Sequence, residues 1–234
     1  LDGCNEVLNR TRPDVLRRIH ADYLAAGADI IETNTFGGTP LVLAEYGLGD
    51  RAEALNTRAA ELARRAADEA STVKKPRFVA GSVGPTTKSL VVTGGVTFTE
   101  LREHFRRQIR GLVAGGVDLL LIETCQDTLN TKAALLAAED VFAQVGERRP
   151  VGVSGTIEPM GTMLAGQTAE ALAVSLDHVD LLFLGLNCAT GPEFMTDHLR
   201  TLHHLARCPV SCYPNAGLPD EEGRYGETPD GLAM

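Results

Sequence analysis

The feature that most constrains the fold is a repeat of short apolar runs that alternate with helix-length stretches along the chain. Three of these runs share one design, in which an Asp precedes an apolar run that ends in polar or reactive residues: AAGADIIETNTF (25–36), AGGVDLLLIETC (114–125) and LDHVDLLFLGLNC (176–188). Three more fit the remaining strand positions: RFVAGSVGP (77–85), PVGVSGTI (150–157) and PVSCYPNAG (209–217). Near-continuous rather than alternating apolar character is typical of parallel strands that are buried on both faces.

The segments between these runs have the length and composition of helices. We predict helices at 13–26, 51–70, 99–113, 128–145, 168–177 and 193–206. For the first of them, Thr11 is the expected N-cap, Pro13 lies in the first turn and Gly27 ends the helix. Strands that alternate with helices of this size predict right-handed βαβ units.

The order of these units favours a (β/α)8 TIM barrel over a doubly wound sheet. The chain has no Gly-x-Gly-x-x-Gly turn after a strand, and polar residues follow every predicted strand. Six strands are two fewer than a closed barrel needs. We therefore expect residues 1–234 to be a barrel truncated to about six βα units, without its first and last strands. The chain begins with Leu rather than Met, which indicates a piece of a longer protein.

Composition excludes several classes of function. With 31 acidic against 22 basic side chains and a net charge of -9, the chain has no basic footprint for nucleic acid or an anionic membrane. No apolar run approaches the roughly 20 residues that span a bilayer, and the N-terminus lacks the pattern of a signal peptide. Five cysteines, an odd number, favour a reducing compartment, so we expect a cytoplasmic protein.

In a barrel of this kind the active site lies at the carboxyl ends of the strands. The polar or reactive residues there are Glu32, Thr33, Asn34, Ser82, Glu123, Thr124, Cys125, Ser154, Thr156, Asn187, Cys188, Tyr213 and Asn215. Glu123 stands out because a carboxylate directly after a buried strand is costly unless it meets a cation or hydrogen-bond donors. It either forms a salt bridge within the barrel or recognises a cationic group, such as a substrate ammonium.

Cys188 is the second candidate, since it follows the most apolar run of the chain. Its thiol is consistent with a packed side chain, a nucleophile or one ligand of a metal. The other cysteines do not complete a metal site: Cys208 and Cys212 are separated by about 13 Å of strand. We expect Cys4, Cys125, Cys208 and Cys212 to be structural.

Two further sequence patterns do not indicate a catalytic or binding site. The histidines of the helix at 193–206, His198, His203 and His204, do not share one helical face, so we expect them to face solvent. The stretch GSVGP (81–85) lacks the spacing of a phosphate-binding loop and is interpreted as a strand-to-helix turn.

Taken together, six segments resemble the homocysteine-binding domain of the cobalamin-dependent methionine synthases. In order along the chain they are GCNEVLNRTRPDV, AGADIIETNTFGGT, GVDLLLIETCQDTLNTKAA, SGTIEPMGTMLAGQT, GLNCATGP and YPNAGLPD. The resemblance covers essentially the whole chain. It implies a (β/α)8 barrel that binds zinc through three cysteines.

The resemblance also implies roles for individual residues. Cys188 matches the zinc ligand after the sixth strand, whereas the other two ligands belong to a Gly-Gly-Cys-Cys segment that this sequence does not contain. The family's Asp-Gly-rich loop of the first strand is missing as well. Glu123 matches the glutamate that holds the homocysteine amino group. We expect Asn34, Ser82 and Asn187 to contribute to substrate binding, and Asn187 to order the loop beside the metal ligand.

The implied activity is zinc-dependent methyl transfer to the thiol of homocysteine, which yields methionine. The donor would be methylcobalamin, carried by another module and recharged by methyltetrahydrofolate on a folate-binding module of the same parent chain. Two alternatives stay open: a standalone homocysteine S-methyltransferase that uses S-methylmethionine or betaine, and a scaffold barrel that has lost its zinc site. With one zinc ligand of three, we expect residues 1–234 alone to be inactive.

Overall fold

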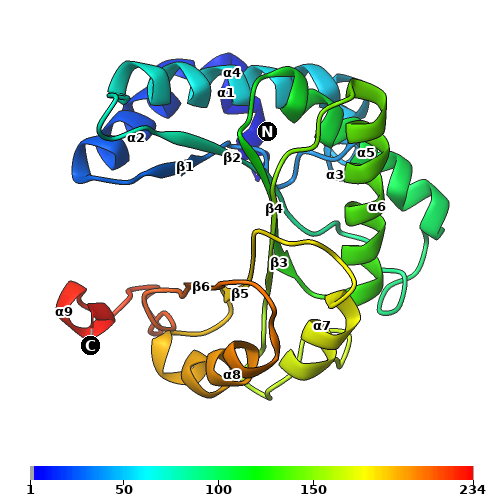
Figure 1. Cartoon of the computed structure of the whole chain (residues 1–234), viewed down its shortest axis with the longest axis vertical. Helices are drawn as coiled ribbons and strands as arrows, with labels where there is room; N and C mark the ends of the chain where they lie inside the picture. Colours follow the sequence, from blue (N-terminus) through cyan, green and yellow to red (C-terminus); the bar gives the residue numbers. More distant parts are fainter. Residues whose placement is uncertain (1–2, 234) are drawn as a thin grey trace. The chain divides into compact units, whose positions relative to one another are not determined.

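The computed structural model describes residues 3–233, and the chain divides into two compact units (Figure 1). Unit 1 comprises the residues up to Ile122 together with Asn130–Pro150. Unit 2 comprises Glu123–Leu129 and the residues from Val151 onward. One strand and one helix, β3 (Leu119–Cys125) and α6 (Thr128–Val145), each contribute residues to both units. Each unit is therefore described by itself.

Unit 1 contains a parallel sheet covered by long helices. Besides its parts of β3 and α6, its elements are η1 (Asn5–Val7), α1 (Leu8–Thr11), α2 (Pro13–Ala26), β1 (Ile30–Glu32), α3 (Pro40–Ala44), η2 (Gly49–Arg51), α4 (Ala52–Ala70), β2 (Phe78–Val83) and α5 (Phe98–Ala114). Strand β2 pairs in parallel with both β1 and β3, with Glu32 opposite Ala80 and Ser82 opposite Leu121. The order of the strands follows the sequence, as expected for consecutive βαβ units.

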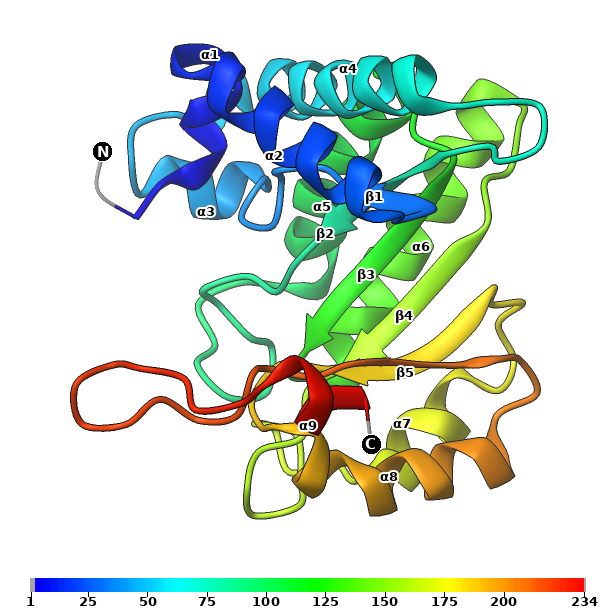
Figure 2. The same ribbon diagram turned by 90° about the vertical axis from the view of Figure 1, so that its left-hand side faces the viewer.

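Unit 2 repeats this alternation of parallel strands and helices. Its own elements are β4 (Val151–Gly155), α7 (Ala169–Leu176), β5 (Phe183–Asn187), α8 (Pro192–Leu205), β6 (Val210–Tyr213) and α9 (Pro229–Ala233). Strand β5 pairs in parallel with β4 and β6, and Asn187 is opposite Tyr213. Figure 2 shows the long loop that connects β6 to α9, in which Pro219 and Tyr225 form an isolated bridge. A Cβ at Gly185 would collide with Ser211 on β6, which explains the glycine in this apolar run.

All six predicted strands and six predicted helices are present, and α2 and α6 have the predicted bounds. The N-cap of α2 differs from the prediction, and so does the start of α5. Thr11 ends α1, where its hydroxyl donates to the Val7 carbonyl at 3.1 Å, and Arg12 is the N-cap of α2. The chain breaks at Arg12 because a residue before proline disfavours the helical conformation. Helix α5 begins at a capping box of Thr97 and Glu100, so it starts before the predicted Thr99.

The expectation that every strand is buried on both faces is wrong for the two outer strands. In β1, Ile30 is 46% exposed, and in β6 no residue is buried. Among the described residues of their units, β1 pairs only with β2 and β6 only with β5. Strands β2 and β5, which each have a paired strand on either side within their own unit, are buried at every residue except the first.

The packing of α4 on α5 depends on small side chains. Buried alanines line α4, among them Ala59, Ala60 and Ala63. On α5, a Cβ at Gly111 would lie 2.5 Å from the Glu53 carbonyl oxygen of α4. Only glycine permits this approach of two helix backbones, so the alanine-rich composition of 52–70 reflects close helix packing.

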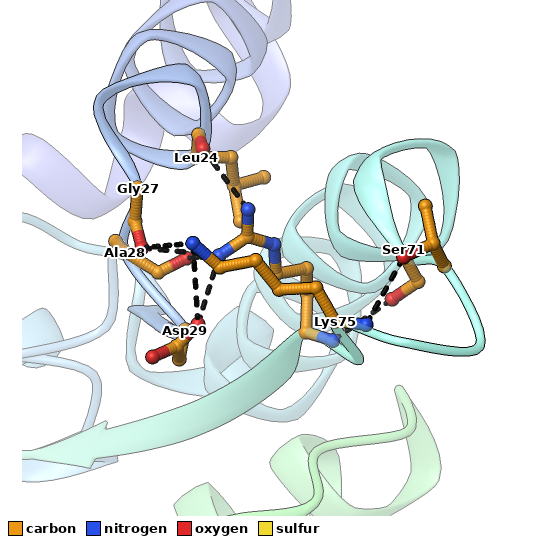
Figure 3. Close-up of polar contacts among 8 residues, drawn as sticks. Leu24, Gly27, Ala28, Asp29, Ser71 and Lys75 are labelled. Carbon is orange, nitrogen blue, oxygen red and sulfur yellow. Dashed lines mark hydrogen bonds and ion pairs between the residues drawn. The ribbon is translucent and has the colours of Figure 1, made fainter.

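The Asp that recurs before the strands has a structural role in unit 1. Asp29 accepts a hydrogen bond from the Arg77 guanidinium at 3.0 Å and lies 3.8 Å from Lys75 Nζ. The same guanidinium donates to the carbonyls of Gly27 and Ala28 at 3.1 and 2.5 Å (Figure 3). Arg77 is only 9% exposed, and it satisfies the backbone acceptors that follow α2.

Asp118 plays a similar part before β3. Its Oδ2 accepts from the backbone N–H of Val79 at 2.7 Å and from Arg64 at 2.5 Å. The recurring aspartates in unit 1 therefore anchor the amino ends of strands, whereas the predicted chemistry belongs to the carboxyl ends.

Candidate functional site

Unit 1 places Asn34 and Ser82 at the carboxyl ends of β1 and β2, as predicted. Thr35 Oγ1 donates to the Ser82 carbonyl at 2.7 Å, and the Ser82 N–H donates to Thr33 Oγ1 at 3.0 Å. The Gln108 side chain of α5 donates to the Thr35 carbonyl at 2.7 Å. These residues, apart from the half-buried Asn34, are all buried, so the two strand ends form one hydrogen-bonded network.

The segment before α2 is tied to the same strand ends, which the sequence reasoning missed. Buried Glu6 accepts from the Gly37 N–H at 2.6 Å, and the Asn9 amide donates to the Asn34 carbonyl at 2.8 Å. The Asn34 amide donates in turn to the Asn5 carbonyl at 2.7 Å. The signal that could have pointed to this role is the pair of polar residues Glu6 and Asn9, which lie three apart in the segment before α2. Asn34 thus holds the N-terminal segment, and its contact with substrate stays a prediction.

Unit 2 brings together the ends of β3, β4 and β5. Glu123 is 8% exposed at the end of β3, and the Thr156 N–H after β4 donates to the Cys125 carbonyl at 3.0 Å. Asp127 accepts from the Leu129 N–H at 2.7 Å and so caps the start of α6. The carboxylate predicted to bind a cation therefore belongs to a buried residue of β3.

Two buried side chains join the end of β3 to the end of β5. Thr124 donates its backbone N–H to Asn187 Oδ1 at 3.0 Å, and Asn187 Nδ2 donates to Thr124 Oγ1 at 2.8 Å. The two residues are 7% and 5% exposed. Asn187 was predicted at this site, but its bonding to Thr124 was not.

Cys188 begins a strained turn after β5. Cys188 has φ 64° and Ala189 has φ 58°, and both are non-glycine residues in the left-handed region. The Cys188 N–H donates to the Tyr213 carbonyl at 3.2 Å, and the Asn215 N–H donates to the Thr190 carbonyl at 3.2 Å. The thiol itself is half-buried. This turn is thus held against the loop after β6 and presents a cysteine that is accessible in part.

All five cysteines are free thiols. Burial raises the pKa of Cys4 and of Cys208, which suits the structural role expected for them. Within residues 3–233, no group of three His, Cys, Asp or Glu side chains is arranged to hold a metal ion. Cys188 fits a zinc site as one thiol donor, and the further donors of such a site would have to come from outside the described residues.

The histidines of α8 follow the prediction in part. His203 and His204 are exposed, and their rings lie 5.8 Å apart, whereas His198 is half-buried. A different histidine, His20 of α2, is buried, and desolvation lowers its pKa. No helix among the described residues is long and apolar enough to cross a membrane.

Comparison with known families matches residues 2–234 to the homocysteine S-methyltransferase family model. The chain is 45% identical to methionine synthase of Mycobacterium leprae (strain TN) and 44% identical to methionine synthase of Mycobacterium tuberculosis (strain ATCC 25618 / H37Rv), in each case over its full length. It spans 20% of the length of these relatives.

Solved structures give a consistent result. The crystal structure of the homocysteine methyltransferase MmuM from Escherichia coli in its metallated form matches with a TM-score of 0.76 and 26% identity, over 90% of this chain and 75% of that one. The apo form of the same enzyme matches with a TM-score of 0.70 over 91% of this chain and 76% of that one. This likeness confirms the α/β fold class expected from the sequence.

Proposed function

This chain belongs to the homocysteine S-methyltransferase family, and we propose that it is the part of a methionine synthase that binds homocysteine and presents its thiol for methylation. One observation carries the proposal beyond family membership. Within unit 2, the Thr124–Asn187 pair joins the strand end that bears Glu123 to the strand end that bears Cys188. An anionic group and a thiol are thereby held at one end of one sheet, which suits a substrate with an ammonium and a sulfur.

Each of the two residues has a distinct part in this proposal. The Glu123 carboxylate accepts hydrogen bonds from the substrate ammonium, and its burial strengthens that interaction because little water competes for either charge. Cys188 supplies one thiolate ligand to a zinc ion, and residues of the parent protein beyond this chain supply the others. Zinc bound in this way would lower the pKa of the homocysteine thiol, so that a nucleophilic thiolate exists at neutral pH.

The methyl donor belongs to the parent protein as a whole. We propose methylcobalamin on a separate module, recharged by methyltetrahydrofolate on a folate-binding module, because the methionine synthases matched here are five times longer than this chain. The higher identity to these enzymes, 45% against 26% for MmuM, favours this donor over S-methylmethionine or betaine. Five free thiols favour a reducing compartment, and we propose the cytoplasm.

The proposal is tested by replacing Cys188 in the full-length parent protein. We expect Cys188→Ala to lose both bound zinc and methionine formation, because two remaining thiolates leave the ion exposed and weakly held. Zinc is measured by atomic absorption, and methionine by chromatography. Cys212→Ala, which removes an exposed thiol of β6, is the matched control and should retain both. A Cys188→Ala protein with a full equivalent of zinc would contradict the proposal.

A further inference from the structure

We propose that Thr124 and Asn187 are positioning residues that set the spacing between the Glu123 carboxylate and the Cys188 thiol. This inference rests on the proposed function and extends it to substrate selectivity. Neither residue needs to touch the substrate for this role. Their effect passes through the two residues next to them in the chain, since Thr124 follows Glu123 and Asn187 precedes Cys188.

The hydrogen bonds between the two residues are reciprocal. Asn187 uses its amide oxygen to accept from the Thr124 N–H at 3.0 Å and its amide nitrogen to donate to the Thr124 hydroxyl at 2.8 Å. The planar amide of Asn187 thus bonds to both the backbone and the side chain of Thr124, which leaves little rotational freedom for the two side chains. Both residues are more than nine-tenths buried, so water does not compete for these bonds.

The backbone conformation adds an independent observation. Within residues 3–233, the non-glycine residues with positive φ are Thr124 at 53°, Cys188 at 64° and Ala189 at 58°. Left-handed backbone is especially unfavourable for a β-branched residue such as Thr, and it persists only where the surroundings enforce it. The Asn187 amide supplies that constraint at Thr124, because it binds the N–H of the left-handed residue itself. One of these residues follows Glu123, and the other two are Cys188 itself and the residue after it.

The substrate explains why a set spacing would matter. In homocysteine the sulfur and the amino group are held apart by three carbon atoms, so the two can be recognised at once only if their partners are correctly spaced. A misplacement of about 1 Å can cost on the order of 100-fold in rate. A rigid link between the two strand ends therefore selects thiols that carry an amino group at this distance.

The test uses the zinc-loaded full-length protein and a pair of variants that differ by one hydroxyl. Thr124→Val removes the hydroxyl but keeps the β-branch, whereas Thr124→Ser keeps the hydroxyl and is the matched control. Two quantities are measured: kcat/KM for homocysteine, and the inhibition constant of 4-mercaptobutanoate, which is homocysteine without its amino group. We expect Thr124→Val to lower kcat/KM by about 10- to 100-fold. For Thr124→Val, the inhibition constant of 4-mercaptobutanoate and the zinc content should stay within about twofold of the wild-type values. For Thr124→Ser, all three quantities should stay within about twofold of the wild-type values.

A double-mutant cycle shows whether the effect passes through Glu123. If it does, Glu123→Gln combined with Asn187→Ala should cost little more than either change alone, because both remove the same interaction with the substrate amino group. Additive losses would overturn the proposal. The proposal would also be overturned if Thr124→Val impaired the use of homocysteine and the binding of 4-mercaptobutanoate equally, which is the result expected of general disorder. It would likewise be overturned if Thr124→Val changed neither.

Further measurements distinguish a loss of the positioning role from a loss of folding and from a failure of the proposed function. Thermal unfolding of each variant is followed by circular dichroism, and Thr124→Ala, which relieves the β-branch strain, replaces Thr124→Val if the latter unfolds. Retention of zinc by Cys188→Ala would contradict the proposed function whatever Thr124→Val does. Loss of zinc by Cys188→Ala together with an unchanged Thr124→Val would leave the proposed function standing and overturn the positioning role.

Discussion

The polar strand ends of the two units differ in what their side chains do. In unit 1 the side chains of Glu6, Asn9, Asn34 and Thr35 bond to backbone groups, and among the described residues of this unit no non-glycine residue has a positive φ. In unit 2 the strand ends carry the three left-handed non-glycine residues, and side-chain bonds hold one of them in place. Backbone strain persists where the surrounding structure enforces it, and such positions cluster at functional sites. From this difference we expect substitutions at the unit 1 strand ends to act mainly on stability, and those at the unit 2 strand ends to act mainly on activity.

The buried glutamates Glu123 of unit 2 and Glu6 of unit 1 should respond differently to substitution. Glu123→Gln in unit 2 removes a charge without changing the side chain's shape, so the parent protein should fold normally. We expect kcat/KM for homocysteine to fall by about 10- to 150-fold, the worth of a charge-assisted hydrogen bond. Steady-state kinetics measures the fall. The exposed Glu193 of α8 provides the control Glu193→Gln, which should leave the kinetics unchanged.

Glu6 in unit 1 should respond in the opposite way. Glu6→Ala leaves the Gly37 N–H without its acceptor, and we expect a loss of about 1–3 kcal/mol in the free energy of unfolding. Urea unfolding of this chain, followed by circular dichroism, measures that loss. Glu61→Ala removes an exposed carboxylate paired with Arg58 and should cost less than about 0.5 kcal/mol. Equal stabilities of the two variants would show that Glu6 does not hold the N-terminal segment.

The smallest effect concerns the pH dependence of stability. Burial lowers the pKa of His20 below its unfolded value of 6.5, so the unfolded chain binds a proton before the folded chain does. Stability contributed by neutral His20 is therefore present above pH 6.5 and is lost as the pH falls below it. One such proton contributes at most about 1.4 kcal/mol per pH unit.

His20→Gln should accordingly flatten the decrease in unfolding free energy between pH 7 and pH 5. Urea titrations at several pH values measure the slope. His203→Gln, at an exposed position of the same residue type, should leave the slope as it is in the wild type. A His20→Gln slope equal to that of the wild type would mean that other groups govern the acid sensitivity.

Much of the fold was predictable from the sequence because the positions of strands and helices depend on local patterns. Apolar runs placed all six strands, and the bounds of α2 and α6 were predicted to the residue. Glu123 and Cys188 were predicted as site residues because each is a reactive residue that follows a buried run, and the family resemblance supports that prediction. The exposed faces of β1 and β6 were not foreseen, because exposure depends on how many neighbouring strands a strand has.

Local sequence patterns were sufficient to predict the parallel α/β class, the order of the strands and the residues at their carboxyl ends. Hydrophobic periodicity and the chemistry of single residues are properties of short segments, and they need no knowledge of distant ones. The bonds between Asn187 and Thr124, 63 residues apart, and from the Gly37 N–H to Glu6 became known from the three-dimensional structure. Such contacts form between groups with no pattern of spacing in the chain, because folding rather than sequence separation brings them together.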